Sequence, residues 1–113
     1  MIAVKYFVVI MTHPDGDGWG LHVMPHVEYL QGLIAQGKLR ASGPATGLPL
    51  RAGLLIFTVE DRAELDALIA ADPFASEGLI DQLTIVEWDP LFGAFAAESS
   101  LGQVVTPPRE RTV

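Results

Sequence analysis

Three histidines are the residues of this chain whose chemistry and spacing first suggest a site. His13 lies in a loop rich in glycine and aspartate, where we expect a solvated side chain. His22 and His26 are four residues apart near the start of a predicted helix, and such a pair can hold a metal ion. No set of glutamate ligands follows the pair, His22 can precede the helix, and the chain has no cysteine, so we expect no metal site.

His26 has the spacing of a residue that points inward. It shares a helical face with Leu30 and Leu33, which directs its ring toward the predicted sheet. We expect it in the first helical turn, where the helix dipole favours a neutral imidazole. A neutral imidazole with one free nitrogen can act as a general base. The alternative interpretation is a structural histidine whose hydrogen bonds are satisfied inside the core.

Asp72 is the second unusual polar residue, because it follows the predicted second helix and precedes Pro73-Phe74. A carboxylate at a helix C-terminus faces the negative end of the dipole, which is unfavourable. One interpretation is that Asp72 closes an Asx-type turn. The other is that its carboxylate holds a histidine in one tautomer. The sequence pattern leaves both open.

The elements that must position these residues follow the order βαββαβ, within a length of 113 residues that suits one domain. Strands are predicted over residues 4–11, 39–45, 53–59 and 83–88, and helices over 21–37 and from an Asp61 N-cap to Asp72. Pro25 is expected in the first helical turn, and Gly43-Pro44 is expected to break the second strand. This order predicts an α+β fold, with a four-stranded antiparallel sheet and two helices on one face.

The predicted strands carry apolar side chains on both faces. In the first strand Tyr6, Val8 and Ile10 point to one face, and the equally apolar residues between them point to the other. Helices cover only one face, so the other would expose a large apolar patch. Burying roughly 600 Å² of it would contribute on the order of 15 kcal/mol before entropy costs. We therefore expect a homodimer that packs sheet against sheet, with a partner of another sequence as the alternative.

Composition excludes several classes of function. The net charge of −7 repels phosphate backbones, and basic residues cluster only near Arg109 and Arg111, so no nucleic-acid partner is expected. No apolar run approaches the roughly 20 residues of a membrane span, so no membrane partner is expected. The apolar start, Met1 to Met11, lacks a basic leader and a cleavage site, which indicates a strand and a cytoplasmic protein.

A set of short motifs links these residues in order along the chain. The motifs are Met24-Pro25-His26, Tyr29-Leu30, Gly37-Lys38-Leu39, Ala41-Ser42-Gly43-Pro44, Gly53-Leu54-Leu55-Ile56, Ala71-Asp72-Pro73-Phe74 and Gly78. Over roughly residues 4 to 89 this set resembles the YCII (YciI-like) family. The resemblance implies a ferredoxin-like fold that pairs into a dimeric α/β barrel, similar to muconolactone isomerases and small antibiotic-biosynthesis monooxygenases. It also implies that His26 and Asp72 form a catalytic pair in a cleft, beside a turn containing Ser42 and Gly43.

Few members of that family have an established reaction, and one type removes chloride from a chlorinated hydroxyquinol. The resemblance therefore favours a lyase or isomerase without a cofactor, acting on a small molecule such as a hydroxylated aromatic. His26 would be the general acid/base, Asp72 would orient it, and Ser42 with the Gly43 amide would hold a substrate oxygen. One alternative is a non-catalytic module that binds a small molecule or serves a pathway as an accessory subunit. Another is a haem- or flavin-assisted oxidoreductase, although no G-x-G-x-x-G motif is present.

Two segments depart from the family pattern. The loop from His13 to Trp19 is long and is expected to reshape the cleft. The chain also continues after the last predicted strand, which divides it into a YCII-like domain over residues 1–92 and a tail over residues 93–113. We expect the tail to be partly disordered or to pack on the partner subunit, with Phe92 and Phe95 covering the neighbouring copy.

Overall fold

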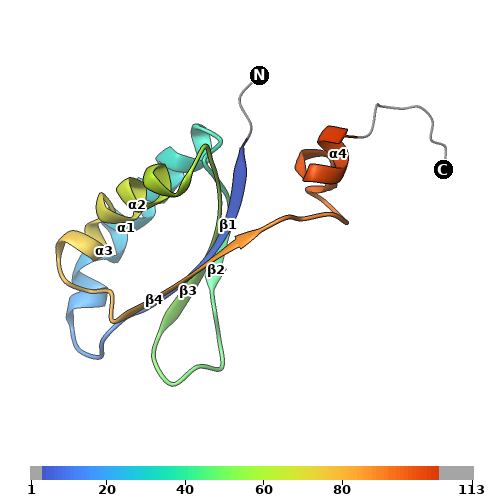
Figure 1. Ribbon diagram of the computed structural model, residues 1–113. Coiled ribbons are helices and arrows are strands. Elements are labelled where there is room, and N and C mark those ends of the chain that lie inside the picture. Colours follow the sequence, from blue (N-terminus) through green and yellow to red (C-terminus); the bar gives the residue numbers. More distant parts are fainter. Residues whose placement is uncertain (1–3, 105–113) are drawn as a thin grey trace.

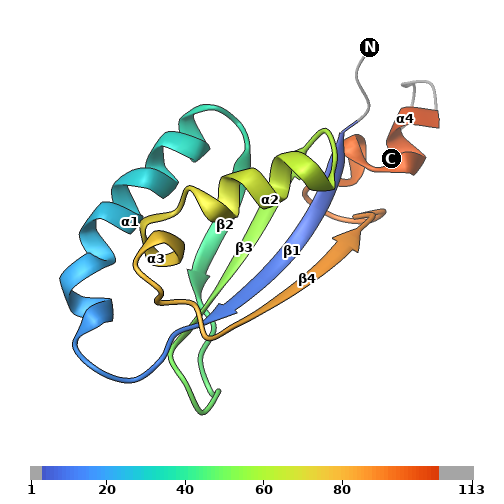
Figure 2. The same ribbon diagram turned by 60° about the vertical axis from the view of Figure 1, so that its left-hand side comes forward.

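A computed structural model of the chain describes residues 4–104. Its strands are β1 (Lys5–Thr12), β2 (Leu39–Pro44), β3 (Ala52–Val59) and β4 (Gln82–Trp88), and its helices are α1 (Gly18–Ala35), α2 (Arg62–Ala70), α3 (Pro73–Ser76), η1 (Ala96–Glu98) and α4 (Ser100–Val104). The strands form one antiparallel sheet in the order β2-β3-β1-β4. Helices α1, α2 and α3 cover one face of this sheet (Figures 1 and 2). The α+β prediction, with helices on one face of a four-stranded sheet, is confirmed.

The core lies between the sheet and these helices. Alternate residues of the two central strands supply its buried side chains: Phe7, Val9, Met11, Leu55 and Phe57. They pack against Leu33 of α1 and against Leu65 and Ile69 of α2. This apolar layer fixes α1 over the sheet, and α1 carries His26.

The opposite face of the sheet is apolar as well, as the strand pattern predicts. Val8 of β1 lies between Ile56 of β3 and Val86 of β4 in the strand register. Val86 is 53% exposed, and the views in Figures 1 and 2 show no helix packed across this face. The structure describes a single copy of the chain, so pairing through this face stays a prediction.

Helix α1 begins at Gly18, earlier than the predicted Leu21, and Pro25 lies inside it. The prediction that Pro25 and His26 occupy the first helical turn is therefore wrong. Proline lacks the N–H that would reach the carbonyl of Leu21, one turn earlier. Leu21 is 73% exposed, so water can reach this part of the helix. Because His26 is well inside α1, the dipole argument for a neutral imidazole does not apply to it.

Strand β2 continues through Gly43-Pro44, so the predicted break there is also wrong. β2 is an edge strand, and Pro44 lies opposite Gly53 of β3. An edge strand tolerates proline because its outward N–H has no ladder partner to lose. The second predicted helix begins as expected, since the Asp61 side chain accepts a 2.8 Å hydrogen bond from the Glu64 N–H.

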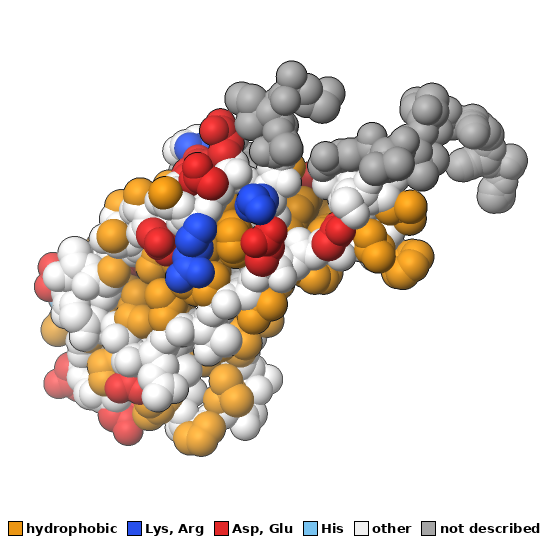
Figure 3. Space-filling model, viewed as in Figure 1, with side chains coloured by type: hydrophobic (Ala, Val, Ile, Leu, Met, Phe, Trp, Pro, Cys, Tyr) orange, Lys and Arg blue, Asp and Glu red, His pale blue; other side chains and the backbone are white. Residues whose placement is uncertain are grey.

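Residues 89–104, here called the C-terminal arm, leave the end of β4 and project from the sheet (Figure 1). Phe95 of the arm lies 5.4 Å from the Tyr6 ring, measured between centroids. The Tyr6 hydroxyl donates to Glu98 at 2.6 Å, and Arg40 forms an ion pair with Glu98. Acidic and basic side chains are mixed across the middle of the side seen in Figure 3, and hydrophobic ones show along the arm.

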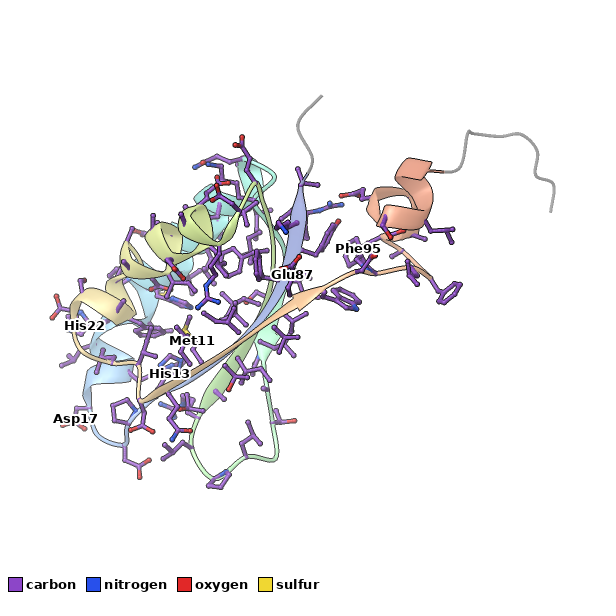
Figure 4. All side chains as sticks on the ribbon, in the orientation of Figure 1. Met11, His13, Asp17, His22, Glu87 and Phe95 are labelled. Carbon is purple, nitrogen blue, oxygen red and sulfur yellow. The ribbon has the colours of Figure 1, made fainter. Side chains whose placement is uncertain are left out.

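These contacts attach the arm to its own sheet. Figure 4 places Phe95 where the arm meets the sheet, on the side away from the helices. Phe92 is 83% exposed, so the structure leaves it available to a partner. Residues 105–113 of the predicted tail lie outside the described residues, and packing of the tail on a second copy stays a prediction. None of the helices within residues 4–104 has the length and hydropathy of a membrane span.

Candidate active site

His26 and Asp72 are joined in the structure, although they are 46 residues apart in the chain. The Nδ1 atom of His26 lies 2.9 Å from each carboxylate oxygen of Asp72. The Asp72 side chain is 3% exposed and that of His26 is 13% exposed. An ionised carboxylate only accepts hydrogen bonds, so Nδ1 carries a proton and donates it. This arrangement leaves Nε2 as the second ring nitrogen, with no hydrogen bond to any described residue.

Asp72 also caps the short helix α3. Its Oδ1 accepts a 2.9 Å hydrogen bond from the N–H of Phe74, and its backbone is extended. The two interpretations of Asp72 from the sequence therefore hold together: it closes a turn and it contacts a histidine. The Phe74 amide orients the carboxylate, and the carboxylate in turn orients the imidazole.

The Phe74 ring packs against the face of the His26 ring. The two rings stack with centroids 4.2 Å apart and planes 23° apart, and Phe74 is 1% exposed. The His13 ring contacts the same phenyl ring at 4.6 Å. Phe74 therefore restricts rotation of the His26 ring. The Pro73-Phe74 step after Asp72 was part of the sequence motif, and its role here is to pack the histidine.

His13 is buried, with 4% exposure, so the prediction of a solvated loop histidine is wrong. Its Nδ1 lies 2.7 Å from the Leu79 carbonyl oxygen, which only accepts, so Nδ1 donates. One pattern in the sequence could have indicated that His13 is buried. His13 continues the alternation of Val9 and Met11, which face the core, beyond the end of β1 (Figure 4).

A cavity of about 410 Å³ opens between α1 and the ends of β2 and β3. His26, Val23 and Leu30 line it from α1, and Met11 and Leu55 line it from the sheet. Asp72 does not line it, because His26 lies between the carboxylate and this space. The free Nε2 is therefore the atom of the pair that a molecule in the cavity can reach.

Ser42 and Gly43 border the same cavity as His26. Ser42 lies opposite Leu55, on the face that the helices cover, whereas Gly43 lies opposite Leu54, on the other face. The Ala45 N–H donates to Ala52 O at 2.9 Å just beyond the strand. Hydrogen-bonded pairs alternate along an antiparallel ladder, so the Gly43 amide is directed at β3. Gly43 borders the cavity through its backbone, and Ser42 offers a hydroxyl on the cavity side.

Trp19 and Arg51 also border the cavity, and neither was predicted as a site residue. Trp19 comes from the beginning of α1, and Arg51 precedes β3. The guanidinium carbon of Arg51 lies 4.0 Å above the centroid of the Trp19 ring. Trp19 belongs to the loop that was expected to reshape the cleft. Arg51 lies in a turn with no periodicity, so no pattern could have identified it.

His22 takes no part in this cavity. Its Nε2 lies 3.6 Å from a carboxylate oxygen of Glu77, and both side chains are partly exposed. Within residues 4–104, no group of three or more His, Asp or Glu side chains is close enough to hold a metal ion.

Tyr29 lies close enough to the His26–Asp72 pair for the charge of Asp72 to shift its pKa. Burial raises the pKa of its hydroxyl, and the negative charge of Asp72 raises it further. The hydroxyl donates a 2.7 Å hydrogen bond to the Leu68 carbonyl oxygen. Tyr29 therefore stays neutral near Asp72, and it ties α1 to α2 beside the pair.

Comparison with known protein families adds the decisive observation: the model of the YCII-related domain matches residues 6–89. The chain belongs to the YCII-related family. The matched range contains every residue of the cavity described above, and it ends at residue 89, where the C-terminal arm begins. The expected resemblance is thus confirmed, including its ferredoxin-like fold. Nothing among the curated proteins matches this YCII-related chain.

Two solved structures have a similar fold. One is the 5-chloro-2-hydroxyhydroquinone dehydrochlorinase of Burkholderia phenoliruptrix, in complex with 2,5-dihydroxybenzoquinone. It is 23% identical, with a TM-score of 0.65 over 74% of this chain and 92% of that protein. The other is a proposed antibiotic biosynthesis monooxygenase of Bacteroides thetaiotaomicron. It is 13% identical, with a TM-score of 0.54 over 79% of this chain and 90% of that protein.

Proposed function

We propose that this YCII-related protein is a lyase or isomerase that uses no cofactor and acts on a small molecule in the cavity. One observation carries the proposal: Asp72 engages Nδ1 of His26, and this leaves Nε2 for a molecule in an adjoining cavity. A histidine held this way can take a proton and return it. His26 is the general acid/base, and Asp72 is a positioning residue that acts through it.

The chemistry begins when Nε2 of His26 removes a proton from carbon or oxygen of the substrate. The imidazole becomes a cation, and the adjacent Asp72 carboxylate stabilises that charge. In an isomerisation the same nitrogen returns the proton to another atom of the substrate. In an elimination the electron pair of the broken C–H or O–H bond forms a new double bond in the substrate. The carbon–halogen bond then breaks, and the halide leaves with its electron pair. General acid–base catalysis of this kind contributes about 10²- to 10⁴-fold in rate.

The walls of the cavity favour a flat substrate. Trp19 and Phe74 are aromatic, and the remaining wall of α1 and the sheet is mostly aliphatic. Ser42 borders the cavity, and in this proposal its hydroxyl donates a hydrogen bond to a substrate oxygen. The fold is shared with a dehydrochlorinase that binds 2,5-dihydroxybenzoquinone, which supports a hydroxylated aromatic as the substrate class. The reaction of that enzyme is one candidate for this chain.

The proposal also includes a homodimer. Among the described residues 4–104, no helix covers the apolar face around Val8, Ile56 and Val86. A second copy related by two-fold symmetry would cover it with an identical surface. The exposed Phe92 on the C-terminal arm lies outside this face and is available to the same partner.

The test is turnover of a panel of hydroxylated and chlorinated hydroxylated aromatics by the wild-type protein and by two variants. H26Q should lose about 10²- to 10⁴-fold in kcat, because the general base is gone. The matched control is H22Q, which changes a histidine of the same helix that lies outside the cavity. A folded H26Q variant with full turnover would refute the mechanism. Saturable binding by the wild type without any turnover would favour a non-catalytic binding module.

A further inference from the structure

The cavity contains one formally charged side chain that the proposed mechanism does not use, namely that of Arg51. The other polar side chains that line it are Ser42, Trp19, His13 and His26. No acidic side chain within the described residues lines it, although the chain as a whole has a net charge of −7. A single cationic side chain in the cavity of an acidic protein is explained if the cavity binds an anionic ligand.

Arg51 has no acidic partner within residues 4–104. Arg40 pairs with Glu98 and Arg62 pairs with Asp66, whereas no ion pair up to 4.0 Å includes Arg51. Asp17 borders an outer hollow together with Arg51, but the two form no such pair either. Within residues 4–104 the other two arginines, Arg40 and Arg62, each pair with a carboxylate, so the missing partner distinguishes Arg51.

Trp19 holds the guanidinium of Arg51 in a defined place. The guanidinium carbon is 4.0 Å from the ring centroid, which is a close cation–π contact. This contact uses no N–H donor, and no described residue accepts a hydrogen bond from the guanidinium of Arg51. The N–H donors of a guanidinium match a carboxylate, or another anionic oxygen, through charge-assisted hydrogen bonds. Arg51 is therefore fixed and polar at the edge of the cavity without being neutralised.

The same cavity also carries the base, His26. His26 stacks on Phe74, and Phe74 also lines the cavity. The Asp72 carboxylate does not line the cavity, and it accepts hydrogen bonds from His26 and from the Phe74 amide. A flat ring that enters the cavity can thus meet a cation at one point and the free nitrogen of His26 at another.

We infer that the substrate is a planar ring compound with an anionic oxygen substituent, and that Arg51 binds this substituent. The inference rests on the proposed function, and it adds a substrate class and a specificity residue to it. The anionic group is a carboxylate or an ionised ring hydroxyl, since both present an oxygen to the guanidinium edge. Arg51 fixes the anion, and the reacting part of the ring then lies toward His26.

The test is calorimetric titration with two pairs of ligands of nearly equal shape. The carboxylate pair is para-hydroxybenzoate and para-hydroxybenzamide, and the phenolate pair is para-nitrophenol and para-nitroanisole at mildly alkaline pH. The wild type should bind the anion of at least one pair about tenfold or more tightly than its neutral partner, as charge-assisted hydrogen bonds allow. The pair that shows this preference identifies the anionic group.

R51Q should lose the preference for the anion and keep its affinity for the neutral ligand. R51K keeps the charge and should retain part of the preference. The retained affinity of R51Q for the neutral ligand shows that R51Q still folds around a working cavity. R62Q is the matched control, because Arg62 is an exposed arginine on α2 outside the cavity, and it should behave as the wild type. An equal preference in R51Q and the wild type would overturn the inference, and so would a wild type that prefers neither anion.

This outcome is separable from that of the proposed function, because binding is measured without turnover. Loss of turnover in H26Q with an unchanged ligand preference in R51Q would leave the mechanism standing and remove the role of Arg51. Loss of the anion preference in R51Q, together with full turnover in H26Q, would support the role of Arg51 and refute the mechanism proposed for His26.

Discussion

Nδ1 of His26 lies 2.9 Å from both carboxylate oxygens of Asp72, and Asp72 in turn accepts a hydrogen bond from the Phe74 amide. Three groups from the single segment 72–74 thus fix the imidazole that α1 carries. The Phe74 ring stacks on that imidazole at 4.2 Å. A histidine restrained in this way presents one nitrogen to the cavity in a fixed tautomer, which is the requirement for rapid proton transfer.

Replacing Asp72 by Asn tests its positioning role. An amide can still cap α3 through its oxygen, so D72N should fold with at most a small loss of stability. It can no longer stabilise an imidazolium, and kcat should fall about 10²-fold or more while KM stays nearly constant. Steady-state kinetics and a thermal melt measure both effects. D66N, on the exposed part of α2, is the control, and an unchanged kcat in D72N would contradict the role.

Gly53 tests whether the cavity is the ligand site. It lies opposite Met11 on the helix-covered face of the sheet, and a Cβ there would meet only the Gly43 carbonyl oxygen, at 3.9 Å. G53V should therefore fold, because valine suits a strand, and its side chain should occupy part of the cavity. Affinity for ring ligands should fall tenfold or more in calorimetry, an effect of about 1.4 kcal/mol. A folded G53V protein that binds such ligands normally would place the site elsewhere.

Val86 tests the homodimer. The wild type should be a dimer by light scattering at micromolar concentration, and V86E should be a monomer, because a carboxylate would be buried in the paired sheets. The control is I34E, since Ile34 is also 53% exposed but lies on α1. I34E should remain a dimer. A stable wild-type monomer would contradict pairing through the sheet.

Acid should release the C-terminal arm. The hydrogen bond from Arg40, followed by that from Tyr6, lowers the pKa of the Glu98 carboxyl from its ordinary 4.5. A carboxyl whose pKa is lower in the folded state contributes stability that is present above its unfolded pKa. That stability is lost as the pH falls through the folded pKa, so the window lies below pH 4.5.

Fluorescence of Trp88 reports this transition, because Phe95 of the arm lies 6.3 Å from its ring. In a W19F background, the emission should change as the pH falls below that window. E98Q should remove this pH dependence, whereas E28Q, on the exposed part of α1, should leave it intact. An E98Q protein with the same acid transition would show that other carboxyls release the arm.

Local patterns in the sequence determined much of the fold. Strand alternation identified both apolar faces of the sheet, and the Asp61 and Glu64 spacing identified the start of α2. These patterns depend only on residues within one helical turn or one strand, so they can be recognised in a single sequence. The prediction of where α1 begins was wrong for the same reason, because it too depended on local signals. Asp17 makes no capping hydrogen bond with its side chain, and the first turn contains Gly18 and Gly20.

The sequence by itself therefore determined the elements, their order, the apolar faces and two candidate residues, His26 and Asp72. Only the tertiary structure decided that these two touch across 46 residues, and that Arg51 and Trp19 close the same cavity as His26. Periodicity tells which face a residue occupies, but contacts between distant segments depend on how helices pack over the sheet. That packing is set by the whole core, which no local pattern contains.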